Sequence, residues 1–514
     1  MNSRHVLRWF SVVLSFAALA GFAPLRAQSL ASFEQRVTLH RLANGWTFLL
    51  VRRPVAPVFS FVTIADVGSA QEVPGIFGLA HMFEHMAFKG TPNLGTTDWP
   101  AEEKALAAVE AAYQAWQDER FSPRPDPQKL ETLYAEFKKR EEEAGRFVTK
   151  GAFDSLVQLE GGVGLNASTG ADTTRYFYSL PANKLELFAY LESERFYRPV
   201  FREFYQERDV VQDERRYSVD SQPEGRLLEQ LLGSAFVNHP YGHSTIGAAS
   251  DLQAFTRTDA ENFFRDWYAP SNLLTVLVGD VDPATAIPMI EKYFGRIPAR
   301  KTPSPLRTVE AEQIAEKTVI LRDRSEPIYI EVYHKPAITD PDEPVWDVLD
   351  LALSSGRASR LYRALVRDKK LAVSVSTFSG VPGAKYPHLW GVFVIPAQGA
   401  SLDKVREGVR VELDRLKAGD LSDAELSRAK RRVRSTLLRD LQSNEGLARQ
   451  LADYQRYFGD WRETFRYLDR VDAVTKADVA RIATAAFIDS HRTVAQVVRD
   501  DQPAPGPTTA QEGN

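Results

Sequence analysis

Two segments that lie far apart in this 514-residue chain begin in the same way. Thr256-Arg-Thr-Asp259 and Thr475-Lys-Ala-Asp478 each place a threonine where it can cap a helix, with an acidic residue three positions later. Each predicted helix leads into an apolar strand, Leu273–Val278 in one case and Thr493–Val498 in the other. A chance similarity between two helix starts is the alternative. If the repeat is real, the fold is α+β, with two related halves that each pack a mainly antiparallel sheet against helices.

Changes in composition along the chain mark the expected boundaries of these halves. We expect the first half at 28–298 and the second at 316–499, separated by a polar, proline-containing linker at 299–315. Residues 500–514 are polar and contain three prolines, which predicts a disordered tail.

A charged helical segment interrupts the first half at 101–150. Ala101–Glu119 and Lys129–Arg146 are rich in alanine, glutamate and lysine, and a proline-rich stretch separates them. This pattern predicts a helical hairpin inserted into the half. The hairpin is either a surface for a partner or substrate, or a solvated insertion without a role of its own.

The N-terminus is typical of a secretory signal peptide at 1–27. Arg4 and Arg8 precede an apolar run, Trp9–Ala23, and Ala27 supplies a small residue at the expected cleavage site. An uncleaved anchor is the alternative. No later stretch is long and apolar enough to span a membrane, so we expect no stable membrane span after cleavage. The expected location is the bacterial periplasm or the exterior.

Charge and cysteine content narrow the possible partners and ligands. The formal net charge is −4, and removal of 1–27, with three arginines and no acidic residue, makes the chain more acidic. This balance argues against nucleic acid as a partner. The chain contains no cysteine, so any bound zinc must be held by histidine, aspartate or glutamate.

One pentapeptide in the first half has the spacing of a metal site. In His81-Met82-Phe83-Glu84-His85 the two histidines lie four residues apart, which places both imidazoles and the Glu84 carboxylate toward one side of a helix. Two neutral imidazoles can hold Zn²⁺, and a carboxylate between them can activate water there. The alternative to a metal site is a buried helix in which both histidines are satisfied by hydrogen bonds. The corresponding helix of the second half, near Trp346–Ser355, has no histidine.

The stretch Gly78-Leu-Ala-His-Met-Phe-Glu-His-Met-Ala-Phe-Lys-Gly-Thr91 resembles the active-site segment of the pitrilysin/insulinase family of zinc metallopeptidases. The most similar group is the mitochondrial processing peptidase and its bacterial relatives. Glu207-Arg-Asp-Val-Val-Gln-Asp-Glu214 resembles the second motif of that family. The resemblance implies one Zn²⁺ per chain, held by His81, His85 and Glu214.

The same resemblance assigns catalytic roles to two glutamates. Glu84 is implied to be the general base, and Glu207, two helical turns before Glu214, is implied to support the site. Glu203 and Asp213 are expected to be solvated or capping residues. Glu214 lies farther from His85 than is usual in the family, and the insertion at 101–150 accounts for most of the excess.

A further matching stretch, Gly164-Leu-Asn-Ala-Ser-Thr-Gly170, resembles the edge strand that receives substrate in this family. Such a strand pairs with an extended peptide through backbone hydrogen bonds. Asn166 and Ala167 are therefore implied to contact substrate. The alternative for Asn166 is a turn residue that satisfies its own loop. His239 and His243 are also four residues apart, but Pro240 and Gly242 forbid a regular helix between them, so a second metal site is disfavoured.

Taken together, these features predict a zinc-dependent endopeptidase that cleaves peptides or unfolded protein segments inside a closed chamber. In the family, four such halves build the chamber, and this chain supplies two, so we expect a homodimer or a heterodimer with a related chain. A non-catalytic scaffold subunit of a two-chain complex is the alternative. A small-molecule lyase with the same motif order is disfavoured because it needs no second half.

Overall fold

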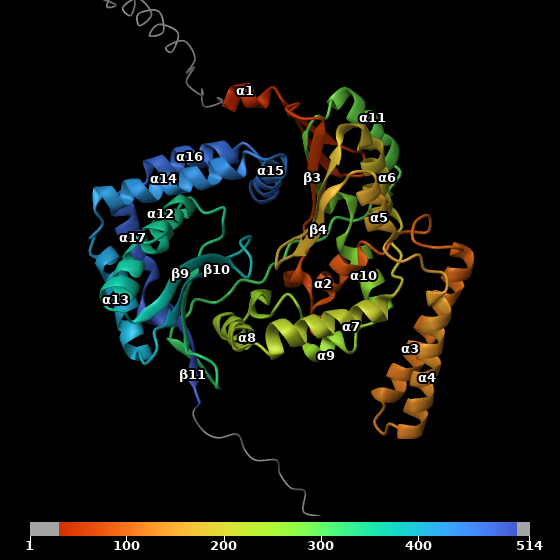
Figure 1. Ribbon diagram of the computed structural model, residues 1–514, viewed down its shortest axis with the longest axis horizontal. Helices are drawn as coiled ribbons and strands as arrows, with labels where there is room; N and C mark the ends of the chain where they lie inside the picture. Colours follow the sequence, from red (N-terminus) through yellow and green to blue (C-terminus); the bar gives the residue numbers. More distant parts are fainter. Residues whose placement is uncertain (1–29, 501–514) are drawn as a thin grey trace, which may run out of the picture.

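The computed structural model describes residues 30–500 and shows two halves, each with one sheet and a set of helices (Figure 1). The predicted signal peptide at 1–27 and nearly all of the predicted tail at 500–514 lie outside the described residues. The α+β fold with two related halves is confirmed. No helix of the described residues is long and apolar enough to cross a membrane.

The sheet of the first half has six strands in the order β1-β2-β6-β3-β5-β4. Only β2 and β6 run parallel to each other, and every other neighbouring pair is antiparallel. β4 is an edge strand, so one side of its backbone is not paired within the sheet. The strands are β1 (Val37–Arg41), β2 (Thr47–Arg52), β3 (Val58–Ala65), β4 (Val163–Thr169), β5 (Thr174–Pro181) and β6 (Leu273–Gly279).

The sheet of the second half repeats this topology with five strands in the order β7-β11-β8-β10-β9. Again a single pair, β7 with β11, is parallel. The order matches β2-β6-β3-β5-β4 strand for strand, so the repeat seen in the sequence reflects a repeated fold. The strands are β7 (Lys317–Asp323), β8 (Ile328–Lys335), β9 (Ala372–Val381), β10 (His388–Pro396) and β11 (Arg492–Arg499).

The two helix starts that suggested the repeat have the same geometry. Thr256 and Thr475 each accept the backbone N–H of the aspartate three residues later, and each aspartate accepts the N–H of its threonine in return. The helices that follow, α10 (Arg257–Trp267) and α17 (Lys476–Ala486), lead into β6 and β11.

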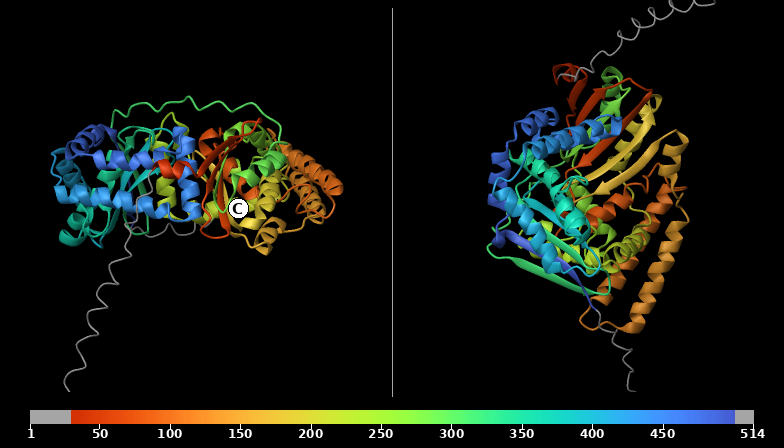
Figure 2. Two further views of the ribbon diagram at one scale, coloured as in Figure 1. Left: turned by 90° about the horizontal axis from the view of Figure 1, so that it is seen from above. Right: turned by 60° about the vertical axis from the view of Figure 1, so that its left-hand side comes forward.

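The remaining helices of the first half are α1 (Leu30–Glu34), α2 (Leu79–Met86), α3 (Trp99–Arg120), α4 (Pro127–Gly145), α5 (Ala152–Leu159), α6 (Leu185–Tyr197), α7 (Phe204–Arg215), α8 (Pro223–Ala235), α9 (Ala249–Leu252) and α11 (Pro283–Phe294). Those of the second half are α12 (Glu343–Ser354), α13 (Leu402–Lys417), α14 (Asp423–Asp440), α15 (Asn444–Phe458) and α16 (Glu463–Ala473). No helix or strand lies between α11 and β7, and this connection crosses from one half to the other (Figure 2).

One helix of each half packs against the sheet of the other half. Leu447 and Leu451 of α15 pack against β3 and β6 of the first sheet, and Leu227 and Leu231 of α8 pack against β7 and β11 of the second. Both leucine pairs are fully buried or nearly so. The exchange covers the face of each sheet that its own helices leave open, so the two halves bury apolar surface against each other.

Polar contacts at this junction hold a loop of the second half against the first. The carboxylate of Asp172, just before β5, accepts the backbone N–H groups of Ala384 and Lys385 at 2.6 and 2.9 Å. It also accepts the hydroxyl of Tyr241. The Lys385 ammonium lies 2.7 Å from Asp66, which follows β3.

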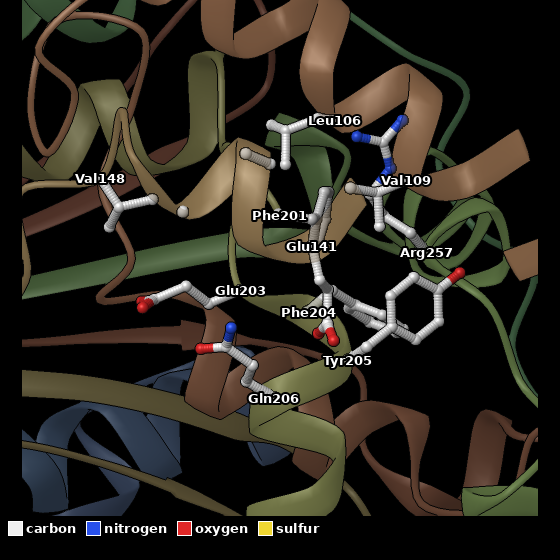
Figure 3. Close-up of a pocket in the computed structure, with 12 residues that line it drawn as sticks. Leu106, Val109, Glu141, Val148, Phe201, Glu203, Phe204, Tyr205, Gln206 and Arg257 are labelled. Atoms are coloured by element: carbon white, nitrogen blue, oxygen red, sulfur yellow. The ribbon is translucent and has the colours of Figure 1, made fainter. Parts of the chain in front are cut away.

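The predicted helical insertion is present as α3 and α4, which form an antiparallel hairpin beside the first half (Figure 1). Its base packs on α7 around a small, mostly apolar cavity (Figure 3). Leu106 and Val109 of α3 lie on one side of that cavity and Phe204 and Tyr205 of α7 on the other. The insertion is therefore anchored to the helix that carries Glu207 and Glu214. The sequence did not predict α5, which follows it.

Candidate metal centre

The helix α2, which carries the two histidines, is short and is fixed from outside. Gly78 precedes it in the left-handed region (φ 103°), where a side chain would collide with the backbone of Ile246. The buried carboxylate of Glu72 accepts the backbone N–H groups of Gly78 and Ala80 at 2.9 and 2.7 Å. Burial raises the pKa of Glu72 to about 8, although the hydrogen bonds from these N–H groups lower it. Sequence reasoning missed Glu72, because it lies six and eight positions before the two groups that it caps.

The two faces of α2 have different surroundings. The apolar side chains of Met82, Phe83 and Met86 are buried in the core of the first half. The opposite side presents His81 and His85, whose ring centroids lie 4.9 Å apart. The amphipathic pattern of the pentapeptide therefore sets the direction in which the histidines point.

The helix α7 brings the third predicted ligand to the histidines. A carboxylate oxygen of Glu214 lies 3.8 Å from Nε2 of His81, and the other lies 3.6 Å from Nε2 of His85. Among the described residues, this is the one group of three or more metal-ligating side chains whose ligand atoms converge, all within 4.8 Å of one another. His239 and His243 belong to no such group.

The donor set fits a zinc ion. Ligand atoms arranged tetrahedrally at about 2.0–2.1 Å from Zn²⁺ lie roughly 3.3 Å from one another. The ligand atoms here are farther apart, with Glu214 at 3.6 and 3.8 Å from the two histidines and all three within 4.8 Å of one another. Two imidazoles and one carboxylate are also ligand types found in catalytic zinc sites with three protein ligands. Small side-chain rotations would complete the coordination.

Burial sets the protonation of the first histidine. It lowers the pKa of His81 to about 4, and the neighbouring His85 contributes further. The imidazole of His81 is therefore neutral at neutral pH, which is the form that binds a metal. Its Nδ1 atom is buried and has no hydrogen-bond partner among the described residues.

The second histidine has a carboxylate partner. Burial alone would lower the pKa of His85, but the hydrogen bond and charge of Glu207, with the charges of Glu214 and Glu84, raise it. Oε2 of Glu207 lies 3.4 Å from Nδ1 of His85 and can accept a hydrogen bond from it. Donation from Nδ1 leaves Nε2 free as the ligand atom, so Glu207 can select the tautomer and the orientation of His85.

Glu84, the predicted base, lies partly buried between the two histidines. Burial raises its pKa, as does the charge of Glu214, whereas Thr169 and His85 lower it. A carboxyl with a raised pKa beside the ligand atoms has the properties that a general base near neutral pH requires.

The prediction that Glu203 is a solvated or capping residue was wrong. Glu203 occupies the N-cap position of α7, but its side chain makes no capping hydrogen bond. Its carboxylate is 11 % exposed and lies 3.3 Å from the Lys89 ammonium. Lys89 also forms a short ion pair with Glu207. Asp213, by contrast, is exposed, as expected.

The predicted substrate residues lie on the edge strand. Asn166 and Ala167 belong to β4, and Asn166 is exposed. The side-chain oxygen of Asn166 accepts the N–H of Ala167 at 2.8 Å, so that backbone group is occupied by its own chain. Both residues line a cavity of about 330 Å³ that also contacts Glu84 and His85. The structure thus places β4 beside the candidate metal centre, and the contact with substrate stays a prediction.

Comparison with known proteins connects this site to a family. The model of the insulinase family (peptidase family M16) matches residues 48–115, which include His81, Glu84 and His85, and the model of the peptidase M16 inactive domain matches residues 254–433. Two models of peptidase family M16 therefore match separate segments of this chain, one in the first half and one mainly in the second. It is 28 % identical to the zinc protease PqqE of Helicobacter pylori over 92 % of this chain and 94 % of that protein. It is 23 % identical to a probable mitochondrial-processing peptidase subunit beta of Arabidopsis thaliana, over 91 % and 79 % of the two chains.

Solved structures share the two-halved fold of this chain. A protease from Helicobacter pylori superimposes with a TM-score of 0.75 at 24 % identity, covering 90 % of this chain and 99 % of that one. The periplasmic protease PqqL from Escherichia coli superimposes with a TM-score of 0.63 at 18 % identity, covering 90 % of this chain but 48 % of that one. PqqL is therefore about twice as long as the region that this chain matches.

Proposed function

We propose that this chain is a zinc-dependent endopeptidase of the insulinase family that cleaves peptides or unfolded protein segments. The observation that carries the proposal is the convergence of His81, His85 and Glu214 ligand atoms beside the Glu84 carboxylate. The similarity to relatives named as zinc proteases supports the same chemistry. His81, His85 and Glu214 would hold the ion.

In the proposed peptide hydrolysis, the metal ion and the protein side chains would have separate roles. When bound, Zn²⁺ would polarise a peptide carbonyl and lower the pKa of a water molecule. Glu84 would accept the proton of the attacking water and return it to the leaving amine. Glu207 would keep His85 in the tautomer and orientation that a ligand requires.

The position of β4 supports a peptide as the substrate. An open strand edge can pair with an extended chain largely independently of its sequence, and β4 lies against α2. The Asn166 amide would leave the N–H of Ala167 when a substrate strand arrives, and would then face the substrate backbone. Folded proteins lack such free extended segments, so we propose unfolded segments and peptides as substrates.

A paired arrangement would close the site. The chain has two halves, and PqqL, of which this chain covers 48 %, is a chain of twice the length. We therefore propose that two chains, identical or related, form a chamber around the substrate. We further propose export to the periplasm or exterior, on the basis of the signal-like sequence at 1–27.

The proposal is tested with an unfolded, fluorescently labelled peptide and three proteins: wild type, Glu84→Gln and the exposed-surface control Glu103→Gln. We expect zinc-dependent cleavage by wild type and the control, abolished by a chelator. Glu84→Gln should bind zinc normally but cleave at least about 10²-fold more slowly. Equal cleavage by wild type and Glu84→Gln would refute the mechanism. If purified, zinc-loaded wild type cleaves no peptide, the scaffold alternative is favoured.

A further inference from the structure

We propose that Lys89 is a positioning residue of the metal centre: its ammonium holds the Glu207 carboxylate against His85 and thereby sets the affinity for the metal. The inference rests on the proposed function, because it takes His85 to be a metal ligand. It assigns a role to a lysine that lies just beyond the end of α2.

The first observation is the way in which the Glu207 carboxylate is shared. One oxygen forms the short ion pair with the Lys89 ammonium, and the other lies 3.4 Å from Nδ1 of His85. Each oxygen thus has one partner. Lys89 and Glu207 are each about one-fifth exposed, so the contact is largely shielded from water and is stronger than a surface ion pair.

The second observation is the backbone contact that fixes Lys89. The carbonyl oxygen of Lys89 accepts a hydrogen bond from the buried guanidinium of Arg202, which also binds the carbonyls of Thr91 and Leu94 at 3.0 and 2.8 Å. Arg202 is in turn paired at 2.7 Å with the fully buried Glu102 of α3. The backbone of Lys89 is therefore fixed by Arg202, and its ammonium is fixed by Glu207. The inserted hairpin contributes to this support through Glu102, which pairs with Arg202.

The third observation concerns Glu203, the other partner of the Lys89 ammonium. Its backbone is in the left-handed region (φ 57°), which costs on the order of 1–3 kcal/mol for a residue other than glycine. This conformation allows the Glu203 carboxylate to turn away from Leu106 and Val109 (Figure 3). The carboxylate lies beside Lys89 and within 3.9 Å of the Lys150 ammonium.

Charge explains why the lysine is needed. The carboxylates of Glu203 and Glu207 both lie beside the Lys89 ammonium, so two like charges come together there and repel each other. Glu214 and Glu84 add two further carboxylates close to His85. Without the Lys89 ammonium, Glu207 would turn toward solvent and Nδ1 of His85 would lose its acceptor. Loss of such an outer partner typically weakens metal binding by about 10- to 100-fold.

The test compares Lys89→Met with Lys89→Arg, and uses Lys129→Met as a matched control. Lys129 forms a similarly close pair with Glu119 at the far end of the hairpin, 2.5 Å apart. Zinc affinity is measured by competition with a chromophoric chelator, and site geometry by the visible absorption spectrum of the Co²⁺-loaded protein. We expect Lys89→Met to weaken zinc binding about 10- to 100-fold and to alter the Co²⁺ spectrum. Lys89→Arg should stay within about threefold of wild type, and Lys129→Met should be unchanged.

A double-mutant cycle shows whether Lys89 acts through Glu207. In a Glu207→Gln background, Lys89→Met should weaken zinc binding no further, because the carboxylate that it positions is gone. An independent further loss would refute the proposed route.

The other possible outcomes separate a failure of this inference from a failure of the proposed function. Wild-type zinc affinity and an unchanged Co²⁺ spectrum in Lys89→Met would overturn the inference and leave the proposed function intact. Failure of wild type to bind zinc would overturn the proposed function itself. If Lys89→Met does not fold, as judged by circular dichroism, Lys89→Gln, which keeps a polar side chain, carries the same expectation.

Discussion

The helices α2 and α12 occupy the same place in the two halves, after the matching strands β3 and β8, yet their polar groups have different surroundings. On α12, Asp347 accepts the Tyr467 hydroxyl, Asp350 accepts the Trp390 indole at 2.9 Å, and Glu343 lies 2.7 Å from Lys335. On α2, the ligand atoms of His81 and His85 instead face the Glu214 carboxylate.

This difference shows what the repeated scaffold provides. Both halves bury the apolar side of the helix, so the scaffold positions a polar cluster in each. In the second half, protein partners occupy the polar groups of that cluster. In the first half, two imidazoles and a carboxylate converge on a common point. The capacity to hold a metal therefore depends on a few side chains and on the absence of internal partners for them, not on the fold.

The largest expected effect is the loss of a predicted metal ligand on α2, which we compare with the loss of a polar side chain on α12. His85→Ala should abolish stoichiometric zinc binding and reduce peptide cleavage by at least about 10³-fold, because several kcal/mol of transition-state stabilisation depend on the ion. Asp347→Asn on α12 should leave zinc content at one ion per chain and activity within about threefold. Metal analysis and cleavage rates check both. Zinc loss in Asp347→Asn would break the comparison, since it would place a second site in the other half.

A second contrast concerns one buried arginine from each half, Arg202 and Arg360. Glu102 of α3 is fully buried beside Arg202, whereas Glu425 of α14 is partly accessible and shares Arg360 with Glu412. Glu102→Gln leaves an uncompensated buried charge and should destabilise the first half by about 3–5 kcal/mol. Glu425→Gln should cost the second half less, because Glu412 remains.

Hydrogen exchange resolved by segment separates these two effects. Glu102→Gln should accelerate exchange in β3 and β5, and Glu425→Gln in β8 and β10, with the larger change in the first pair. Equal acceleration in all four strands would show that the halves unfold as one unit, and would remove the basis for treating their stabilities separately.

Local patterns predicted the parts of this molecule that depend on neighbours in sequence. The caps at Thr256 and Thr475, the hairpin helices and the facing of His81 and His85 all follow from residue spacing and side-chain chemistry. The placement of Glu214 beside the histidines came from resemblance, because spacing alone does not select one carboxylate among many. Its convergence with the histidines is now visible in the structure.

The missing predictions all concern contacts between distant segments. Lys89 and Glu203 are separated by the whole insertion, so no pattern in the sequence indicates that they meet. The exchange of α8 and α15 between sheets could not be predicted either, because an amphipathic helix shows that it has a partner but not which sheet it covers.

Acidic pH should weaken the second half through Glu425. Burial opposes ionisation of this carboxyl, but Arg360 and Ser422 more than offset it and lower the pKa to about 2 from an ordinary 4.5. A lowered pKa means that the full stabilisation is present above pH 4.5 and is lost as the pH falls toward about 2. Protection factors in β8 and β10, which are corrected for the pH dependence of intrinsic amide exchange, should therefore fall over this range in wild type. In Glu425→Gln the same fall should be smaller, and an identical pH profile would count against this origin.

The smallest expected effect concerns the repeated helix starts. Thr256→Ala and Thr475→Ala each remove a side chain that caps the helix and bonds the aspartate at its third position, at nearly the same backbone angles. Each change should cost about 1 kcal/mol. Thr258, on α10, also bonds Glu110 of α3, a contact that α17 lacks because the second half has no insertion. The insertion thus holds the α10 end in place when its cap is lost, so exchange at the start of α10 should rise less than at the start of α17. A larger rise at α10 would mean that the insertion does not support the half into which it is inserted.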